Sequence, residues 1–343
     1  MPQKQHNPVI DALRFVAILA VVLVHTTTRT LETTSYALQK VPFTLFLNQA
    51  SRFAVPVFFM ISGYVLELNH SHGTNYLTYL KKRTNRIFIP YVFWSAIYYF
   101  FIYNQNKDTF LGTLFTGNAS YQLYFIPSLI IFYLIFPLIH KFYDIICNKW
   151  VLFLLGVLEV LLLYFNYDVQ SIKLFYPLTV ALLNYFYFIF GIFLAHNQEK
   201  VISLIKKFKL ILFLGSAFFA SLIFYEGLTG YLNTHNYVMF YSQWRPSVLF
   251  YSIFAGGFLY WLFDRAFVNS NFIKTLSKLS FFVFFIHVII LEGLWSLFFR
   301  NLFQINYVQQ FWFDPLYFLL VASVSFGIAY LAHKMPYLSR LTG

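Results

Sequence analysis

Ten apolar segments, each 15 to 21 residues long, recur along this chain and limit what it can fold into. A transmembrane helix needs about 20 mostly apolar residues to cross a bilayer. Hydrophobic residues make up 59% of the 343 residues and charged residues only 10%, against roughly 25% charged in a soluble domain. The sequence therefore predicts an all-α polytopic membrane protein with about ten transmembrane helices. The segments are Val9–His25, Phe53–Leu68, Ile87–Tyr103, Leu123–His140, Val151–Phe165, Leu178–Ala195, Leu210–Tyr225, Ser247–Phe263, Leu279–Phe299 and Leu316–His333.

Lysine and arginine residues are unevenly distributed among the connections between these segments. With a cytoplasmic N-terminus, 16 of them fall on the cytoplasmic side and 7 on the outer side. Cytoplasmic loops of membrane proteins carry such an excess, so we expect both termini in the cytoplasm. The formal net charge of +12 has the same explanation, and we do not expect nucleic-acid binding.

The connections predict one transmembrane domain over residues 1–343, without a soluble extracytoplasmic domain. The longest, about Thr26 to Arg52, is expected to be an outward-facing loop. The first apolar segment leads into threonines rather than a small-residue cleavage site, which favours a retained anchor. The single cysteine, Cys147, excludes an internal disulfide, and no metal site is expected because histidines and carboxylates do not recur at ligand spacing.

Two ionisable residues lie within the first apolar segment, where such groups are costly and often functional. Arg14 and His25 are eleven residues apart, about 20° past three full helical turns, so they share one helix face. Asp11 is three residues before Arg14 and can pair with it. Histidine is the natural general base near neutral pH. The alternatives are a snorkelling arginine and an interfacial histidine without a catalytic role.

A basic cluster precedes the third apolar segment. Lys82, Arg83 and Arg86 are its candidate ligands, and the two arginines share a face if the helix begins early. Arginine suits phosphate oxygens, which favours a cytoplasmic site for a phosphorylated donor such as a coenzyme A thioester. On charge alone, topology together with attraction to anionic lipid is the favoured explanation of the cluster.

Two further segments carry candidate substrate-binding or supporting residues. Ser62 and Gly63 lie in the second apolar segment, where small residues also allow close helix contact. His287 lies deep in the ninth segment and requires a polar partner, and Glu292 follows it by five residues. These polar residues can equally hold helices together.

At these positions the chain resembles the acyltransferase 3 family of integral membrane acyltransferases. The similarity covers nearly the whole chain and rests on Arg14 with His25, the segment Phe59–Tyr64, Arg83-x-x-Arg86 with Ile89-Pro90-Tyr91, and Leu279 through His287. Phenylalanines at 281 and 284 or 285 stand where tyrosines are common in the family. The length and the last segment also resemble the branch from intercellular-adhesin (poly-N-acetylglucosamine) biosynthesis, which is proposed to contain O-succinyltransferases or exporters.

The resemblance implies transfer of an acetyl or succinyl group from cytoplasmic acyl-CoA to a hydroxyl of a cell-envelope carbohydrate. The site would lie in a bacterial plasma membrane, in contact with lipid and with polysaccharide synthase machinery, and would need no metal. Arg83, Arg86 and Lys82 would hold the donor phosphates. Arg14, held by Asp11, would position the donor, and His25 would act as general base or transient acyl carrier. The alternative is an exporter or flippase for a polysaccharide or lipid-linked sugar.

Overall fold

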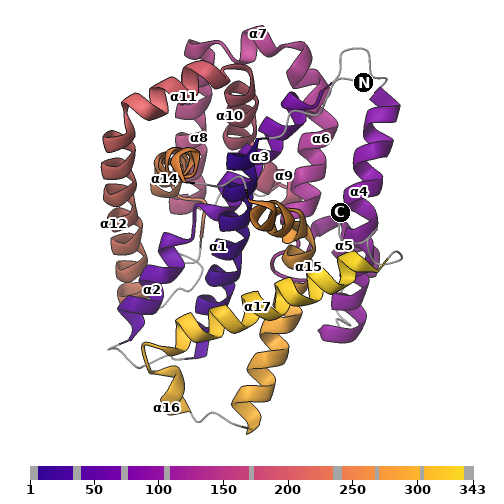
Figure 1. Ribbon diagram of the computed structural model, residues 1–343, viewed down its shortest axis with the longest axis vertical. Helices are drawn as coiled ribbons and strands as arrows, with labels where there is room; N and C mark the ends of the chain where they lie inside the picture. The colour runs from indigo at the N-terminus through magenta and orange to yellow at the C-terminus, as the bar shows by residue number, and fades with distance from the viewer. Residues whose placement is uncertain are drawn as a thin grey trace. The chain divides into compact units, whose positions relative to one another are not determined.

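The computed structural model describes residues 7–33, 40–70, 76–103, 109–169, 174–234, 242–266, 270–301 and 305–335. Within these ranges every regular element is a helix, which confirms the predicted all-α fold (Figure 1). The chain divides into two compact units. Unit 1 contains residues 58–203 with the two chain ends, and unit 2 contains residues 8–57 and 204–334; each is described by itself.

Unit 1 is built around helices α6 and α10, with the other helices packed against them. Helix α6 packs against α4, α9 and α10, and α10 also contacts α8. The sequences of α9 and α10 are apolar and contain many aromatic residues, and the two helices meet at a bend of 48°. The elements of unit 1 are α3 (Ala54–Leu68, from residue 58), α4 (Tyr76–Ile97), the π-helix η1 (Tyr98–Ile102), α5 (Phe110–Thr116), α6 (Phe125–Lys141), α7 (Tyr143–Ile146), α8 (Lys149–Val169), α9 (Tyr176–Leu182), α10 (Tyr185–His196) and the start of α11 (Gln198–Lys207).

Helices α3 and α10 approach closely because each has a glycine at the contact. A Cβ atom on Gly63 would lie 2.1 Å from the carbonyl oxygen of Phe188, and one on Gly191 would lie 2.0 Å from that of Met60. Neither distance allows a side chain without movement of backbone. Gly63 therefore has a packing function here, and the neighbouring Ser62 hydroxyl donates to the Phe58 carbonyl one turn earlier at 2.8 Å.

Unit 2 surrounds the first helix. Helix α1 packs against α2, α14, α15 and α17, and α12 packs against α2 and α14 (Figure 1). Most of α1 is apolar and buried, which explains why it is central. The elements of unit 2 are α1 (Pro8–Thr33), α2 (Val41–Ala50), α12 (Lys209–Thr234), α14 (Pro246–Arg265), α15 (Asn271–Asn301), α16 (Ile305–Val308) and α17 (Phe313–Lys334).

Seven helices in the described part are long and apolar enough to cross a membrane, or up to eight if the bent α9–α10 pair forms one span. This confirms a multi-pass membrane fold. The other predicted spans fall on α6, which is apolar but 17 residues long, and on α4 with η1, where α4 begins with the basic cluster. The total of ten crossings and the cytoplasmic termini stay predictions.

The predicted outer loop from Thr26 to Arg52 is wrong for its described residues. Helix α1 continues to Thr33, and α2 occupies Val41–Ala50 as the first part of an apolar stretch that runs to Leu68. The sequence Val41-Pro42-Phe43-Thr44-Leu45-Phe46-Leu47 is apolar, and Pro42 is tolerated in the first turn of a helix. The segment resembled a loop in the sequence because the polar residues Asn48 and Arg52 follow this apolar run.

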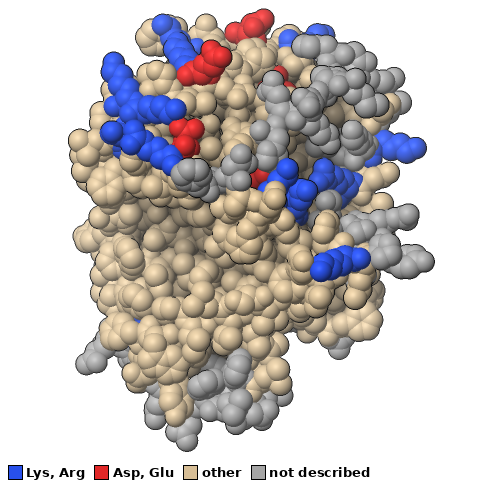
Figure 2. Space-filling view, viewed as in Figure 1, with Lys and Arg blue, Asp and Glu red and all other residues tan. Residues whose placement is uncertain are grey.

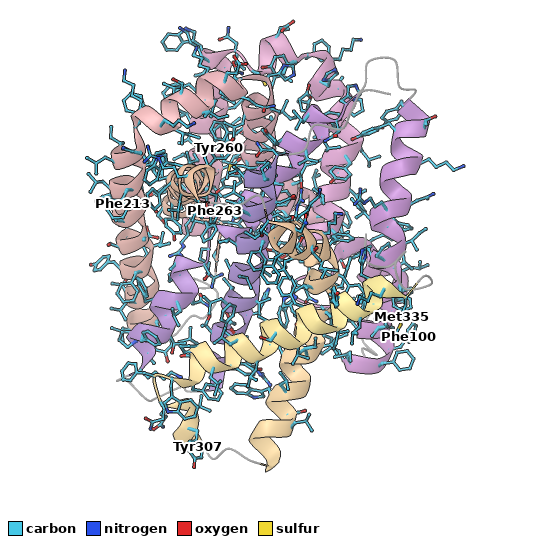
Figure 3. The ribbon with its side chains drawn as sticks, viewed as in Figure 1. Phe100, Phe213, Tyr260, Phe263, Tyr307 and Met335 are labelled. Carbon is cyan, nitrogen blue, oxygen red and sulfur yellow. The ribbon has the colours of Figure 1, made fainter. Side chains whose placement is uncertain are left out.

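The surface of unit 2 carries basic and aromatic side chains in different places. Figure 2 shows blue side chains gathered over the beginning of α12, where Lys206 pairs with Asp264 at 2.9 Å and Arg265 lies over the Trp261 ring. Phe213, labelled on α12 in Figure 3, is 48% exposed and suits contact with lipid. The basic residues thus lie near the helix ends, as expected for a membrane protein.

Candidate active site

The face shared by Arg14 and His25 packs against helix α15. Arg14 Nη1 donates to Ser277 Oγ at 3.1 Å, and the His25 ring centroid lies 5.3 Å from that of His287. Ser277 and His287 are ten residues apart on α15, nearly the spacing of Arg14 and His25 on α1. The two helices therefore run side by side in the same direction, which confirms the predicted common face.

The end of this face nearer the N-terminus is a small polar cluster. Arg14 Nη1 lies 3.2 Å from Asp11 Oδ1, which confirms the predicted pair. The buried Ser277 hydroxyl donates to the same carboxylate oxygen at 2.9 Å. Asp11 thus receives two hydrogen bonds and holds both partners. Arg14 keeps 27% of its side chain exposed, so this end of the face is accessible from outside the cluster.

The centre of the face is a pair of histidines. His287 is fully buried, and its Nδ1 lies 3.0 Å from the Val283 carbonyl oxygen. A carbonyl only accepts, so Nδ1 carries the proton and Nε2 keeps its lone pair. Nε2 is buried and has no hydrogen-bond partner among the described residues. A buried imidazole nitrogen without a partner costs free energy, which favours a substrate group as its partner.

The third contact along the face is an ion pair that the sequence analysis did not identify. Arg29 Nη2 lies 3.2 Å from Glu292 Oε2, and its guanidinium lies 5.3 Å from the Trp295 ring centroid. Glu292 is therefore the ion-pair partner of Arg29. Arg29 lies four residues after His25 on α1. Residues 25 and 29 share a face at helical spacing, so the sequence contained this signal.

Helix α2 supplies polar groups to the turn of α1 around His25, which the loop prediction missed. Buried Asn48 donates through Nδ2 to the Val24 carbonyl oxygen at 3.1 Å and to the hydroxyls of Thr27 and Thr28, both at 3.0 Å. Arg52 donates to Asn48 Oδ1 and interacts electrostatically with His25. The spacing of Asn48 and Arg52 by four residues is the sequence signal for this polar face of α2.

The same helix is fixed to its neighbours by two buried charged groups. Arg245 donates to the Gln49 side chain and lies 3.1 Å from Glu226 Oε2. Lys40 Nζ lies 3.0 Å from Asp314 Oδ2. Burial lowers the pKa of Lys40 from its ordinary value, and Asp314 opposes this effect. These contacts tie α2 to the start of α14 and to α17.

The predicted donor-binding residues belong to unit 1. Lys82, Arg83 and Arg86 lie within α4, which begins at Tyr76, so the cluster is helical as the shared-face argument required. Arg86 is exposed, and the side chains of Lys82 and Arg83 lie outside the described residues. A second group in unit 1 has the composition of a metal site: Glu67, His140 and His196 place their ligand atoms within 4.8 Å of one another.

The acyltransferase domain family model, Acyl_transf_3, matches residues 7–334. The chain belongs to this family. The family indicates acyltransferase activity, and the chain is accordingly a multi-pass acyltransferase of a bacterial membrane. No solved structure matches the chain.

Relatives of the chain occur in staphylococci. One from Staphylococcus epidermidis is 26% identical over 329 residues, which cover 92% of this chain and 88% of the relative. One from Staphylococcus aureus strain MRSA252 is 25% identical over 288 residues, 80% of this chain and 79% of the relative. Both are named "Probable poly-beta-1,6-N-acetyl-D-glucosamine export protein". These names agree with the predicted resemblance to the intercellular-adhesin branch.

Proposed function

We propose that this acyltransferase moves an acetyl or succinyl group from cytoplasmic acyl-CoA to a hydroxyl of a cell-surface polysaccharide or its lipid-linked precursor. The observation that carries the proposal is the His25–His287 pair, in which the buried Nε2 of His287 has no partner among the described residues. A neutral imidazole with a free lone pair is suited to take the proton of an acceptor hydroxyl.

The proposed reaction needs a proton acceptor beside the acceptor hydroxyl. The acceptor hydroxyl gives its proton to an imidazole nitrogen while its oxygen bonds to the thioester carbonyl carbon. The carbon–sulfur bond then breaks, coenzyme A leaves as thiolate and the imidazolium returns the proton to it. Arg14 lies about 16 Å from His25 along α1, so its proposed role is to position the donor, with its guanidinium held by Asp11 and Ser277.

A carrier form of the same reaction uses both histidines. His25 would attack the thioester carbonyl carbon, the carbon–sulfur bond would break and coenzyme A would leave as thiolate. The acceptor hydroxyl would then displace the acyl group from His25, and His287, with its ring centroid 5.3 Å from that of His25, would take the hydroxyl proton. Both forms give the same ester and free coenzyme A.

Arg83, Arg86 and Lys82 are the proposed contacts for the donor phosphates. Their position on one helix supports a common ligand, because residues 83 and 86 are neighbours on a helical surface. The acceptor that we propose is a polymer of β-1,6-linked N-acetylglucosamine, by analogy with the names of the staphylococcal relatives. Its hydroxyl groups are suitable acyl acceptors.

A transfer assay in proteoliposomes tests the proposal. The purified full chain is given acetyl-CoA or succinyl-CoA and a short β-1,6-linked N-acetylglucosamine oligosaccharide, and ester products are measured by mass spectrometry. We expect an ester with one donor, reduced by Arg86→Ala through a higher KM for that donor. Transfer at the wild-type rate with an unchanged KM in Arg86→Ala and Arg83→Ala would remove these residues from the donor site.

The second candidate function is export of the polysaccharide, which the printed names of the relatives favour. An exporter has no need of coenzyme A. Polymer of unaltered chemistry that accumulates inside cells lacking the protein, together with no ester product from either donor, would support export over acyl transfer.

A further inference from the structure

Three helices of unit 1 bring a carboxylate and two imidazoles together at their C-terminal ends. Glu67 lies one residue before the end of α3, His140 one residue before the end of α6, and His196 is the last residue of α10. All three residues belong to unit 1. The predicted orientation places these ends on the cytoplasmic side.

The side chains of this cluster converge on one carboxylate. His140 Nδ1 lies 2.9 Å from Glu67 Oε1 and 3.1 Å from Oε2, and His196 Nε2 lies 2.5 Å from Oε1. Each residue offers one ligand atom, and the three atoms lie within 4.8 Å of one another. Ligand atoms around tetrahedral zinc are roughly 3.4 Å apart, given metal–ligand bonds of about 2.0–2.2 Å. Small side-chain movements would therefore suffice to admit a metal ion.

Neighbouring rings hold the two imidazoles in these orientations. The Tyr143 ring stacks on His196 with centroids 3.6 Å apart, and the His70 ring centroid lies 4.2 Å from that of His140. Asn197 donates to the Tyr143 hydroxyl at 3.3 Å. Ligands held by a packed second layer of side chains need little reorganisation on binding.

The electrostatic setting favours a cation at this point. Each helix C-terminus carries about half a negative charge from its free carbonyl groups, and three helices end here. Glu67 is 8% exposed and adds a carboxylate. Two imidazoles and one carboxylate are the protein ligands of catalytic zinc sites that keep a fourth position open.

We propose that Glu67, His140 and His196 form a binding site for a divalent transition-metal ion of the zinc class. The ion ties the ends of α3, α6 and α10 together. Its fourth position is open to water, since 38% of the His196 side chain is exposed. The site is distinct from the His25–His287 pair, which belongs to unit 2.

Metal content and zinc titration of the full chain test this site. The protein is purified with a tag that lacks histidine, stripped with a chelator and titrated with Zn²⁺ alone. We expect about one zinc per chain and a rise in Tm of a few degrees at saturation. Glu67→Gln should weaken binding by more than about 100-fold, because even supporting residues of metal sites contribute 10–100-fold.

Two further variants keep the test decisive if Glu67→Gln fails to fold. His196→Asn changes a partly exposed ligand and leaves the Glu67–His140 contact in place. His333→Asn is the matched control, since His333 is an exposed histidine one residue before the end of α17. Zinc binding lost in His196→Asn and kept in His333→Asn supports the site. Failure of the wild type to bind zinc, or equal binding by His196→Asn, overturns it and leaves a hydrogen-bonded carboxylate–imidazole cluster.

Discussion

The two histidine clusters of this protein differ in what surrounds the imidazoles. His287 of unit 2 bonds to a main-chain carbonyl and faces His25, while His140 and His196 of unit 1 both contact the carboxylate of Glu67. An imidazole with one nitrogen free is ready to accept a proton. Two imidazoles and a carboxylate are a known ligand set of zinc sites. We therefore propose different chemistries for the two clusters, proton transfer at the first and metal binding at the second.

The largest expected effect comes from removing the imidazole of His25 in unit 2. His25→Ala should lower the acyl-transfer rate by about 10²–10⁴-fold, the usual contribution of a general base. The rate is measured in the proteoliposome assay, with His333→Ala as the histidine control. Full activity in His25→Ala would exclude His25 both as general base and as acyl carrier.

The next largest effect is expected at the contact between α3 and α10 in unit 1. Gly63→Ala would place a Cβ 2.1 Å from a backbone oxygen at the α3–α10 contact, the two helices that carry Glu67 and His196. We expect a loss of at least about 2 kcal/mol in the free energy of unfolding, and weaker zinc binding. The measurement is the thermal unfolding midpoint in detergent.

Gly293→Ala provides the matched control for this substitution. Gly293 lies in α15, and a Cβ there would meet no atom within 4 Å. Alanine has the higher helix propensity, so this variant should gain up to about 1 kcal/mol. Equal destabilisation by both variants would mean that the α3–α10 contact is not specially tight.

A smaller effect is expected at Arg14. Lysine keeps the charge but replaces the planar guanidinium, which contacts both Asp11 and Ser277, with a single ammonium group. Arg14→Lys should raise the KM for the acyl-CoA donor by about tenfold, the loss of roughly one charge-assisted hydrogen bond, and leave kcat nearly unchanged. A lowered kcat with an unchanged KM would assign Arg14 to the transition state instead.

The smallest effect on catalysis is expected from metal removal. The proposed metal ligands and donor contacts belong to unit 1, and the histidine pair belongs to unit 2. Chelation should therefore lower Tm but change kcat at saturating acyl-CoA by less than about twofold, at a temperature where the protein stays folded. The assay compares chelated and zinc-restored protein. Loss of acyl transfer on chelation, with recovery when zinc is restored, would mean that the metal site takes part in the transfer reaction.

Sequence reasoning was most successful where one helix carried the pattern. The spacing of Arg14 and His25 predicted their common face, and the Asp11–Arg14 pair follows from helical geometry. Helix α2 was not predicted because Asn48 and Arg52 are polar residue types that are common in loops. Only the structure shows that both are buried. The Glu67–His140–His196 cluster could not be predicted from a short sequence motif. Its members come from three helices, and Glu67 and His196 are 129 positions apart.

The most direct test of the central claim is the chemistry of the cell-envelope carbohydrate. Polysaccharide is taken from cells that express the wild type, His25→Ala or no protein, with membrane insertion of each protein verified, and its masses are compared. The account predicts an ester-linked mass increment of an acetyl or succinyl group in the wild-type sample alone. Identical carbohydrate in all three samples would contradict acyl transfer at the His25–His287 pair.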